Sequence, residues 1–458
     1  MGARLLRRQE SGNYYSILAI GFLLALAMFG GASRPDELQQ AFIRGAAILA
    51  IAAALWPLNF FVFRDARGPV LGLALIYLLL LAQLLPLPPV IWEQMPAHAI
   101  YADIARQTGS VGWRPWTISP DLTLNSVAAL LPATAIGLVV LALDFRGRLL
   151  VARVLVGIAC ASALLGLMQF AAGGTTLHLF RTTSEDSAVG LFANRNHQAA
   201  FLACVLPIGG ALAAIRAQRQ GVSRRDLAIK LSAALLLLMG LAATGSRMGL
   251  LLGFIGTIAA GLIICMTVRP SDGSRLVSRP MGIAAGGVSL AALLAFSALA
   301  WRAGALSRIA DSAVDQTRVA ALAPMISATR AFFPFGAGFG TFDPVFRTFE
   351  PESSLSTIYL NQAHNEPVQL AIEGGMPALL LLLLFLIWWA RASFRAMRPR
   401  SSAPRRALGM AMVAASLILM LSSLVDYPLR TPLLSGLFAV ACVELVRSRP
   451  HTETPRRV

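Results

Sequence analysis

The chain has 458 residues, of which 57% are hydrophobic and only 13% are charged. A soluble domain contains about 25% charged residues, so this composition excludes an ordinary globular protein and predicts one that is largely embedded in a membrane. The formal charge of +17 does not indicate a nucleic-acid-binding module, because the basic residues punctuate apolar runs instead of gathering on one soluble domain.

Apolar runs recur along the whole chain, and each predicts a membrane-spanning helix, which needs about 20 mostly apolar residues. The first run follows Arg4, Arg7 and Arg8, and we expect a retained helix there because no small-x-small cleavage site precedes a soluble domain. The expected fold class is all-α, a polytopic transmembrane helix bundle with about 12 spans. The predicted spans are 14–31, 43–63, 69–88, 123–143, 149–172, 196–215, 228–245, 248–268, 281–301, 367–390, 407–425 and 431–446.

Basic residues alternate between the loops as the positive-inside rule requires. With a cytoplasmic N-terminus, every cytoplasmic segment holds at least two of them, and the opposite loops are mixed or acidic. We therefore expect a multi-pass protein with both termini in the cytoplasm. The basic cytoplasmic stretch 391–406 is interpreted as a contact with anionic lipid and a topology anchor.

Two long segments face the other side of the membrane in this topology. Residues 89–122 contain Trp92, Trp113 and Trp116, which suit a membrane interface. Residues 302–366 contain seven phenylalanines between positions 332 and 349, so this segment is predicted to be folded and not disordered. The cysteines lie inside apolar runs and predict neither a disulfide scaffold nor a metal site.

Four polar groups lie on this second side or at its membrane boundary. The first is Asn194-Arg195-Asn196-His197, which opens the sixth span and exceeds what a simple helix cap needs. The second is Thr244-Gly245-Ser246-Arg247, a tight turn between two spans that Gly245 permits. Arg247 suits a diphosphate, because its planar fork makes paired hydrogen bonds. The alternatives are a cap in the first group and an Arg247 that snorkels to lipid phosphate in the second.

The third group is Arg318 with the glycine-rich run Pro334 to Phe342. Its glycines permit tight turns or a close backbone approach. The run does not follow a strand and open a helix, which excludes a dinucleotide site.

The fourth group begins with His364-Asn365-Glu366-Pro367 and ends with Glu373-Gly374-Gly375. Pro367 suits the first turn of a helix, and the two glycines with Pro377 are expected to break that helix after about two turns. We therefore predict a short helix at the membrane surface that leads into the tenth span. His364 lies at the start of this helix, and a histidine can gain or lose a proton near neutral pH.

In this order and spacing, the four groups resemble the O-antigen ligase and O-antigen polymerase superfamily of bacterial envelope enzymes. The resemblance covers roughly residues 185–390, and the chain departs from the family's pattern at Pro367 and at Gly375-Met376-Pro377. The matching pieces are Gly190-Leu191-Phe192-Ala193-Asn194-Arg195-Asn196-His197, Thr244-Gly245-Ser246-Arg247, Arg318 with Gly336-x-Gly338-x-Gly340-Thr341-Phe342, and His364-Asn365-x-x-x-Gln369-Leu370-x-x-Glu373-Gly374.

This resemblance implies a multi-pass glycosyltransferase of the C type in the bacterial inner membrane, with one large periplasmic loop. The implied donor is a glycan on undecaprenyl diphosphate, and the acceptor is lipid A-core for a ligase or a growing polysaccharide for a polymerase. The family uses no nucleotide, cofactor or metal, and this chain has no DxD motif. The implied regions are N-terminal helices in 1–184 with the loop 89–122, a catalytic region in 185–390 with the loop 302–366, and C-terminal helices with a cytoplasmic tail in 391–458.

Transfer from a diphosphate builds negative charge on the leaving group, which guanidinium groups can stabilise without a metal. Arg195, Arg247 and Arg318 are the candidates. His364 is the candidate base that accepts the proton of the acceptor hydroxyl, with Glu373 or Glu366 orienting it. The remaining polar residues are assigned to binding the diphosphate or the glycan. They are Asn194, Arg195, Asn196, His197, Ser246, Asn365 and Glu373.

A polytopic transporter or lipid-linked glycan flippase is the main alternative, and a membrane scaffold is a third interpretation. Transport is disfavoured by the long outer loop, by the lack of an internal repeat, and by the lack of carboxylates deep in the spans. Arg153 and Glu444 lie toward the cytoplasmic ends of their spans. Ligase and polymerase both remain open, as do the sugar, the acceptor and the oligomeric state.

Overall fold

The computed structural model describes residues 2–56, 63–64, 66–174, 176–182, 187–220, 223–268, 320–352, 355, 360–399 and 402–447. The predicted span 281–301 and Arg318 lie outside these residues. Within them the regular secondary structure is helical apart from one antiparallel pair of two-residue strands, as the composition led us to expect.

In the described part of the chain, nine helical segments are long and apolar enough to cross a membrane, and each coincides with a predicted span. The predicted spans 69–88 and 431–446 correspond to shorter helices of 17 and 16 residues. The prediction of an all-α polytopic bundle is therefore confirmed. The bundle helices are α1 (Gly2–Phe29), α2 (Leu38–Leu55), α4 (Arg67–Gln83), α7 (Pro120–Ala129), α8 (Leu131–Ala142), α9 (Phe145–Ala171), α10 (Arg195–Gln220), α11 (Arg224–Ala243), α12 (Arg247–Thr267), α17 (Glu366–Met397), α18 (Ala403–Ser422) and α19 (Pro432–Arg447).

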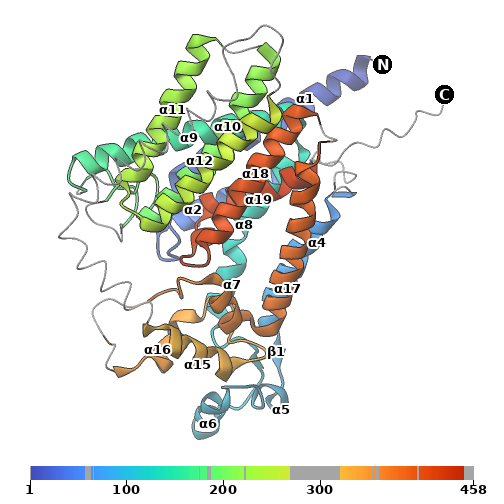
Figure 1. The fold of residues 1–458 in the computed structure, drawn as a ribbon. Helices are drawn as coiled ribbons and strands as arrows, with labels where there is room; N and C mark the ends of the chain where they lie inside the picture. Colours follow the sequence, from blue (N-terminus) through green and yellow to red (C-terminus); the bar gives the residue numbers. More distant parts are fainter. Residues whose placement is uncertain are drawn as a thin grey trace.

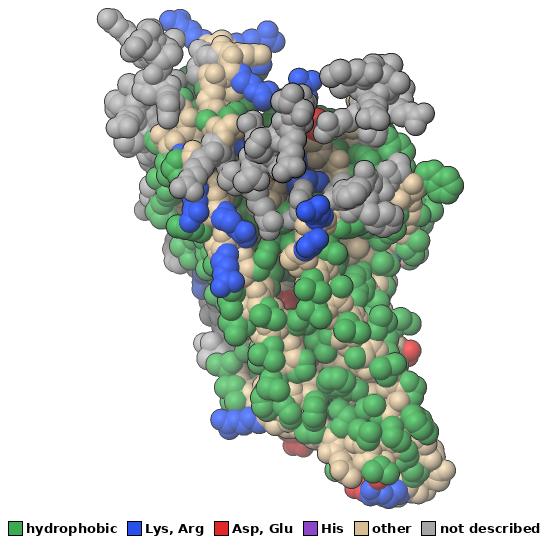
Figure 2. All heavy atoms as spheres, turned by 90° about the vertical axis from the view of Figure 1, so that its right-hand side faces the viewer, with side chains coloured by type: hydrophobic (Ala, Val, Ile, Leu, Met, Phe, Trp, Pro, Cys, Tyr) green, Lys and Arg blue, Asp and Glu red, His purple; other side chains and the backbone are tan. Residues whose placement is uncertain are grey.

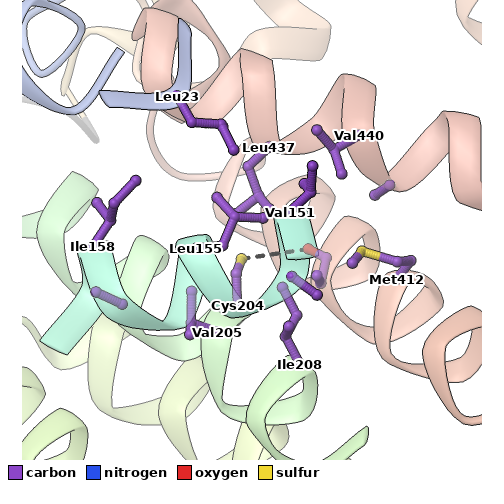
Figure 3. Close-up of a cluster of buried hydrophobic side chains, with 14 of the residues drawn as sticks. Leu23, Val151, Leu155, Ile158, Cys204, Val205, Ile208, Met412, Leu437 and Val440 are labelled. Atoms are coloured by element: carbon purple, nitrogen blue, oxygen red, sulfur yellow. Dashed lines mark hydrogen bonds between the residues drawn. The ribbon is translucent and has the colours of Figure 1, made fainter. Parts of the chain in front are cut away.

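Among the nine long apolar helical segments that the structure describes, α10 is the most deeply buried, with 83% of its most apolar window inside the molecule. Figure 3 shows Cys204 of α10 among side chains from α1, α9, α18 and α19, including Leu23, Leu155 and Leu437. The Cys204 thiol donates a hydrogen bond to the carbonyl of Ala415 on α18 at 3.4 Å. Because so many helices surround α10, the polar residues at its first turn are held in a fixed place.

Small residues bring α12 against α10. A Cβ built at Gly256 would lie 2.4 Å from the carbonyl oxygen of Ala203, and one built at Gly249 would lie 2.3 Å from the Cβ of Ala199. Such close approach of helix backbones is how membrane helices gain packing without a hydrophobic driving force. The two helices run in the same direction, so their N-termini lie at the same end of the bundle.

The described parts of the two long loops fold together at one end of the bundle, below it in Figure 1. We call this part the loop layer, and define it as the described residues of 86–118 and 320–363. Phe332, Phe342 and Phe346 form its small core with Met325, which confirms that the phenylalanine-rich segment is folded. The elements of the loop layer are β1 (Pro86–Leu87), α5 (Pro89–Trp92), α6 (Ala99–Gln107), β2 (Arg114–Pro115), α15 (Leu322–Phe332) and α16 (Phe342–Phe349).

Two tryptophans of the loop layer contact other parts of the protein. Trp92 is 1% exposed and packs against Ala102 and Ala105 of α6, so its expected position at a lipid interface is wrong. The Trp116 indole, just after β2, donates a hydrogen bond to the carbonyl of Gly336 at 3.2 Å. Trp113 is the exposed one of the three. Composition alone does not separate an interfacial tryptophan from one that anchors a folded loop.

The outer surface agrees with a membrane location. Figure 2 shows the face that carries α17 and α4, where hydrophobic side chains form a broad band and basic side chains gather above it. Helix α1 begins at the end of the bundle opposite the loop layer (Figure 1). Helix α19 begins where α1 ends, because the Leu433 amide donates to the carbonyl of Gly30 at 3.0 Å.

Candidate active site

Helices α10 and α12 place two of the predicted arginines at neighbouring helix starts. Gly245 has φ +63°, a conformation that glycine adopts without strain, and it turns the chain from α11 into α12. The Ser246 hydroxyl then accepts a hydrogen bond from the Gly249 amide at 3.0 Å. Arg247 is exposed beside this cap, and Arg195 opens α10 next to it.

Asp426 lies in the short turn between α18 and α19 and is the centre of the polar cluster. Its side chain is 3% exposed. Its Oδ1 accepts hydrogen bonds from the His364 Nδ1 at 3.1 Å and from the Tyr427 amide at 2.9 Å. Its Oδ2 accepts a hydrogen bond from the Asn196 side-chain amide at 2.9 Å. Residues from α10, α17 and the last helical hairpin therefore meet at one carboxylate.

Hydrogen bonding decides the protonation of Asp426. Burial raises the pKa of this carboxyl, but the hydrogen bonds from His364 and Asn196 favour the charged form, and the pKa lies well below its usual range. An ionised carboxylate only accepts hydrogen bonds, so the His364 Nδ1 must be the donor. The neutral imidazole of His364 then has its lone pair on Nε2, where it can accept a proton.

A second histidine lines the same carboxylate. The Nε2 of His197 lies 3.9 Å from the Asp426 Oδ1 and has no hydrogen-bond partner within the described residues. Its Nδ1 lies 2.9 Å from the Thr431 hydroxyl. Both imidazoles contact the Tyr427 ring edge-on, with centroid distances of 5.2 Å for His197 and 4.8 Å for His364. His197 is 1% exposed, so His364 is the histidine that faces outward.

The chain fixes His364 through the start of α17. His364 has φ +50°, and Asn365 caps the helix by accepting a hydrogen bond from the Val368 amide at 3.1 Å. The Asn365 side-chain amide donates to the carbonyl of Leu424 at 3.1 Å, and the Glu366 amide donates to the carbonyl of Ser423 at 2.9 Å. The helix start is thus tied to the turn that contains Asp426.

Glu366 and Glu373 form ion pairs with Arg430, and they are not the carboxylates that contact His364. The guanidinium of Arg430, in the 3-10 turn η2 (Pro428–Arg430), contacts Glu366 at 2.8 and 3.2 Å and Glu373 at 3.4 Å. Glu373 also accepts hydrogen bonds from Gln369 at 2.9 Å and from the Phe342 amide at 3.3 Å. The two glutamates were expected to orient His364, but Asp426 is the carboxylate in contact with it.

The glycine-rich run locks the loop layer onto the break in α17. Gly375 has φ +57° and ψ −148°, which ends the first segment of α17 after Gly374 and confirms the predicted break. The amides of Ala337 and Gly338 donate to the carbonyls of Ile372 and Glu373, both at 2.8 Å. Gln83 of α4 joins the same junction by donating to the Glu373 carbonyl at 3.1 Å.

Several predicted site residues have structural hydrogen bonds. The Asn194 side chain accepts a hydrogen bond from the Asn196 amide at 2.8 Å, so Asn194, like Ser246 and Asn365, acts as a cap. Within the described residues, no group of three or more histidine, cysteine or acidic side chains is arranged to hold a metal ion.

Comparison with known families identifies part of the chain. Residues 232–383 match the family model described as O-antigen ligase. This part of the chain is therefore similar to O-antigen ligases. No curated protein sequence matches the chain. The match confirms the resemblance to the superfamily of O-antigen ligases and polymerases, and it supports a membrane protein that transfers glycans.

Arg247, His364 and Glu373 lie inside the matched O-antigen ligase domain, while Asn196 and Asp426 lie outside it. Sequence reasoning missed Asp426, Tyr427 and Arg430. The sequence did indicate where these residues lie, since in the predicted topology the turn between the last two spans is on the same side of the membrane as His364. A single carboxylate in a short turn is usually solvated, so its burial against two histidines was not predictable from the turn alone.

Proposed function

We propose that this protein moves a glycan from an undecaprenyl-diphosphate donor to an acceptor hydroxyl on the non-cytoplasmic face of a bacterial inner membrane. The O-antigen ligase domain supports glycan transfer in a membrane. The observation that carries the proposal is the contact of 3.1 Å between His364 and the buried carboxylate of Asp426. With Nδ1 bound to Asp426, the His364 Nε2 keeps a lone pair at the end of the bundle that carries the loop layer.

In the proposed reaction, His364 Nε2 accepts the proton of the acceptor hydroxyl while that oxygen attacks the anomeric carbon. The bond between the anomeric carbon and the diphosphate breaks, and undecaprenyl diphosphate leaves with the electron pair. Asp426 holds Nδ1 protonated and stabilises the imidazolium that forms. A positioned general base contributes about 10²–10⁴-fold to such a rate.

The leaving diphosphate gains negative charge, and in this proposal arginines stabilise it and no metal is needed. Arg195 and Arg247 open adjacent, parallel helices, where the helix ends also favour an anion. Arg318, which lies outside the described residues, is the third arginine of the proposal. Asn196 and His197 support Asp426 from the same helix start.

The proposed location follows from where the polar residues gather. His364, Asp426 and the loop layer lie at the end of the bundle that the positive-inside rule assigns to the non-cytoplasmic side. A lipid-borne diphosphate can diffuse in the bilayer to this end without crossing it. The proposed acceptors are lipid A-core for a ligase and a growing polysaccharide for a polymerase.

Deletion of the gene, with analysis of lipopolysaccharide and exopolysaccharide, tests the proposal. Unligated core with finished polymer on its carrier indicates a ligase, and single repeats indicate a polymerase. Complementation with His364→Ala or Arg247→Ala should fail at normal protein levels. Ser435→Ala should restore the glycan, because among the described residues the Ser435 hydroxyl hydrogen-bonds only to the nearby Pro432 carbonyl. Unchanged envelope glycans in the deletion, or near-normal transfer with His364→Ala, would contradict the proposed role.

A further inference from the structure

The C-terminal half of α17 carries a groove. This half of the helix lies at the end of the bundle opposite the loop layer (Figure 1). Leu384, Ile387, Arg391, Phe394 and Arg398 recur at intervals of three and four residues and are exposed, so they form one face of the helix. Trp388 and Arg395 complete the lining of the groove. The proposed transfer reaction uses none of these residues.

The groove changes character along its length. Leu384 and Ile387 make its first part apolar, Trp388 follows, and Arg391, Arg395 and Arg398 make its last part basic. Figure 2 shows basic side chains above an apolar band on this face of the molecule. An apolar stretch, then an aromatic ring, then cations is the order that a phospholipid presents from its chains to its headgroup.

Neighbouring groups order the basic end of the groove. The guanidinium of Arg398 lies 4.8 Å from the centre of the Phe394 ring, a cation–π contact. The Arg395 Nε donates to the carbonyl of Arg391 at 3.1 Å. On the other side, α4 packs so closely on α17 that a Cβ built at Gly68 would lie 2.9 Å from the Trp388 indole nitrogen. These contacts reduce the entropy that the side chains lose when they bind a ligand.

We propose that this groove binds one anionic phospholipid of the cytoplasmic leaflet. The acyl chains lie along Leu384 and Ile387, and the headgroup phosphate contacts Arg391, Arg395 and Arg398. Guanidinium groups favour phosphate oxygens because they donate paired, charge-assisted hydrogen bonds. A zwitterionic lipid carries a compensating ammonium group, so three arginines attract it less than a lipid with net negative charge.

Lipid titration of the full-length protein in detergent, followed by native mass spectrometry, tests the site. The test variant is Arg391→Gln/Arg395→Gln/Arg398→Gln. The control variant, Arg219→Gln/Arg224→Gln/Arg225→Gln, removes the same charge from exposed positions around the start of α11. The probes are dioleoylphosphatidylglycerol and dioleoylphosphatidylcholine. The wild type should retain one phosphatidylglycerol in preference to phosphatidylcholine.

Each basic residue near a membrane surface contributes about a fivefold preference for anionic lipid. The test variant should therefore bind phosphatidylglycerol on the order of a hundredfold more weakly, while the control variant should stay within about threefold of the wild type. If the test variant does not fold, Arg391→Gln alone should weaken binding about fivefold. Equal losses in the two triple variants, equal retention of the two lipids, or displacement by free glycerol phosphate at the same concentration would overturn the proposal.

Discussion

Asp426 accepts hydrogen bonds from three donors and lies against two histidines while almost fully buried. A carboxylate in such surroundings costs free energy unless donors compensate it. The three donors offset that cost and also select which nitrogen of His364 carries the proton. In the proposed reaction, Asp426 therefore acts through His364.

Replacing Asp426 with Asn should reduce glycan transfer by about 10²–10⁴-fold, the range that a general base contributes. An amide can either donate to or accept from His364 Nδ1, so it no longer selects the tautomer that leaves Nε2 free. Initial rates in membranes with a lipid-linked donor, divided by the amount of folded protein, measure the loss. Ser435→Ala on the same hairpin is the matched control and should change the rate by no more than about twofold.

The pH dependence of the transfer rate can distinguish the effect of Asp426 from that of His364, the histidine that it orients. Because the pKa of Asp426 is held well below its usual range, the carboxyl stays ionised from roughly pH 5 to pH 9 and produces no limb of the rate profile there. Asp426→Asn removes a negative charge that favours imidazolium, so the acid limb should move to lower pH. A limb that stays in place would show that Asp426 does not act through histidine.

The ion-pair cluster of Arg430 with Glu366 and Glu373 leads to a different prediction. Arg430→Ala leaves the fully buried Glu373 without its cation, which should destabilise the protein by about 3 kcal/mol. Adding Glu373→Gln to that variant should restore part of the loss, because a neutral amide costs less to bury. Thermal unfolding in detergent measures both. Glu373→Gln alone should keep its transfer rate per folded molecule; a large loss would instead support a contact with substrate.

The sequence pattern singled out His364, whose catalytic role stays a prediction, but the carboxylates expected beside it were the wrong ones. Glu366 and Glu373 are close to His364 along the chain, and that closeness suggested an orienting role. The helix start turns them toward Arg430, which is 57 residues after Glu373. The partner of His364 comes from 62 residues away, so it depends on how the last hairpin packs against α10 and α17, which no local pattern records.

At the scale of elements, the break in α17 was predictable and the reason for it was not. Two glycines followed by a proline indicated the break. The structure shows that the glycine-rich run of the loop layer docks into it, since the Met376 amide donates to the carbonyl of Pro334 at 2.8 Å. Gly375, Gly336 and Gly338 all have positive φ there. Two separate glycine motifs thus form one junction that holds the loop layer on the bundle.

Gly338→Ala should destabilise this junction strongly. Gly338 has φ +109°, and an added Cβ would lie 1.9 Å from the Thr117 hydroxyl oxygen. Gly173→Ala is the matched control, because Gly173 has φ +70° but nothing lies within 4 Å of an added Cβ. The control should cost only the conformational penalty of about 1–2 kcal/mol. Folded yield and thermal unfolding in detergent measure the difference, and equal effects would mean that crowding at Thr117 is unimportant.

At the scale of the whole molecule, hydropathy and charge predict most of the bundle, because lipid requires long helices of apolar residues. The helix order follows from the sequence of apolar runs, the tight turn before α12 from the position of Gly245, and the folding of the loop layer from its phenylalanines. The order of packing around α10 does not, since small residues at the contacts of α10 and α12 look the same in sequence as small residues facing lipid. Hydropathy locates the helices but does not give their neighbours.

The proposed orientation can be tested with single cysteines. Thr348 is an exposed residue of α16 in the loop layer, and Arg225 is an exposed residue at the start of α11. The positive-inside rule predicts that a membrane-impermeant maleimide labels Thr348→Cys in intact spheroplasts and labels Arg225→Cys only after lysis. The unsubstituted protein controls for its own cysteines. The opposite labelling pattern would invert the topology and place His364 in the cytoplasm.

The position of Asp426 in the turn before α19 also affects when the polar cluster can form during synthesis and membrane insertion. Asn196, His364 and Asp426 enter the membrane at widely separated times during synthesis, and Asp426 comes last. Until the final hairpin inserts, His364 lacks the carboxylate that selects its tautomer, and Glu373 lacks Arg430. On the proposed function, a nascent chain should therefore lack transfer activity until the turn that contains Asp426 is in place.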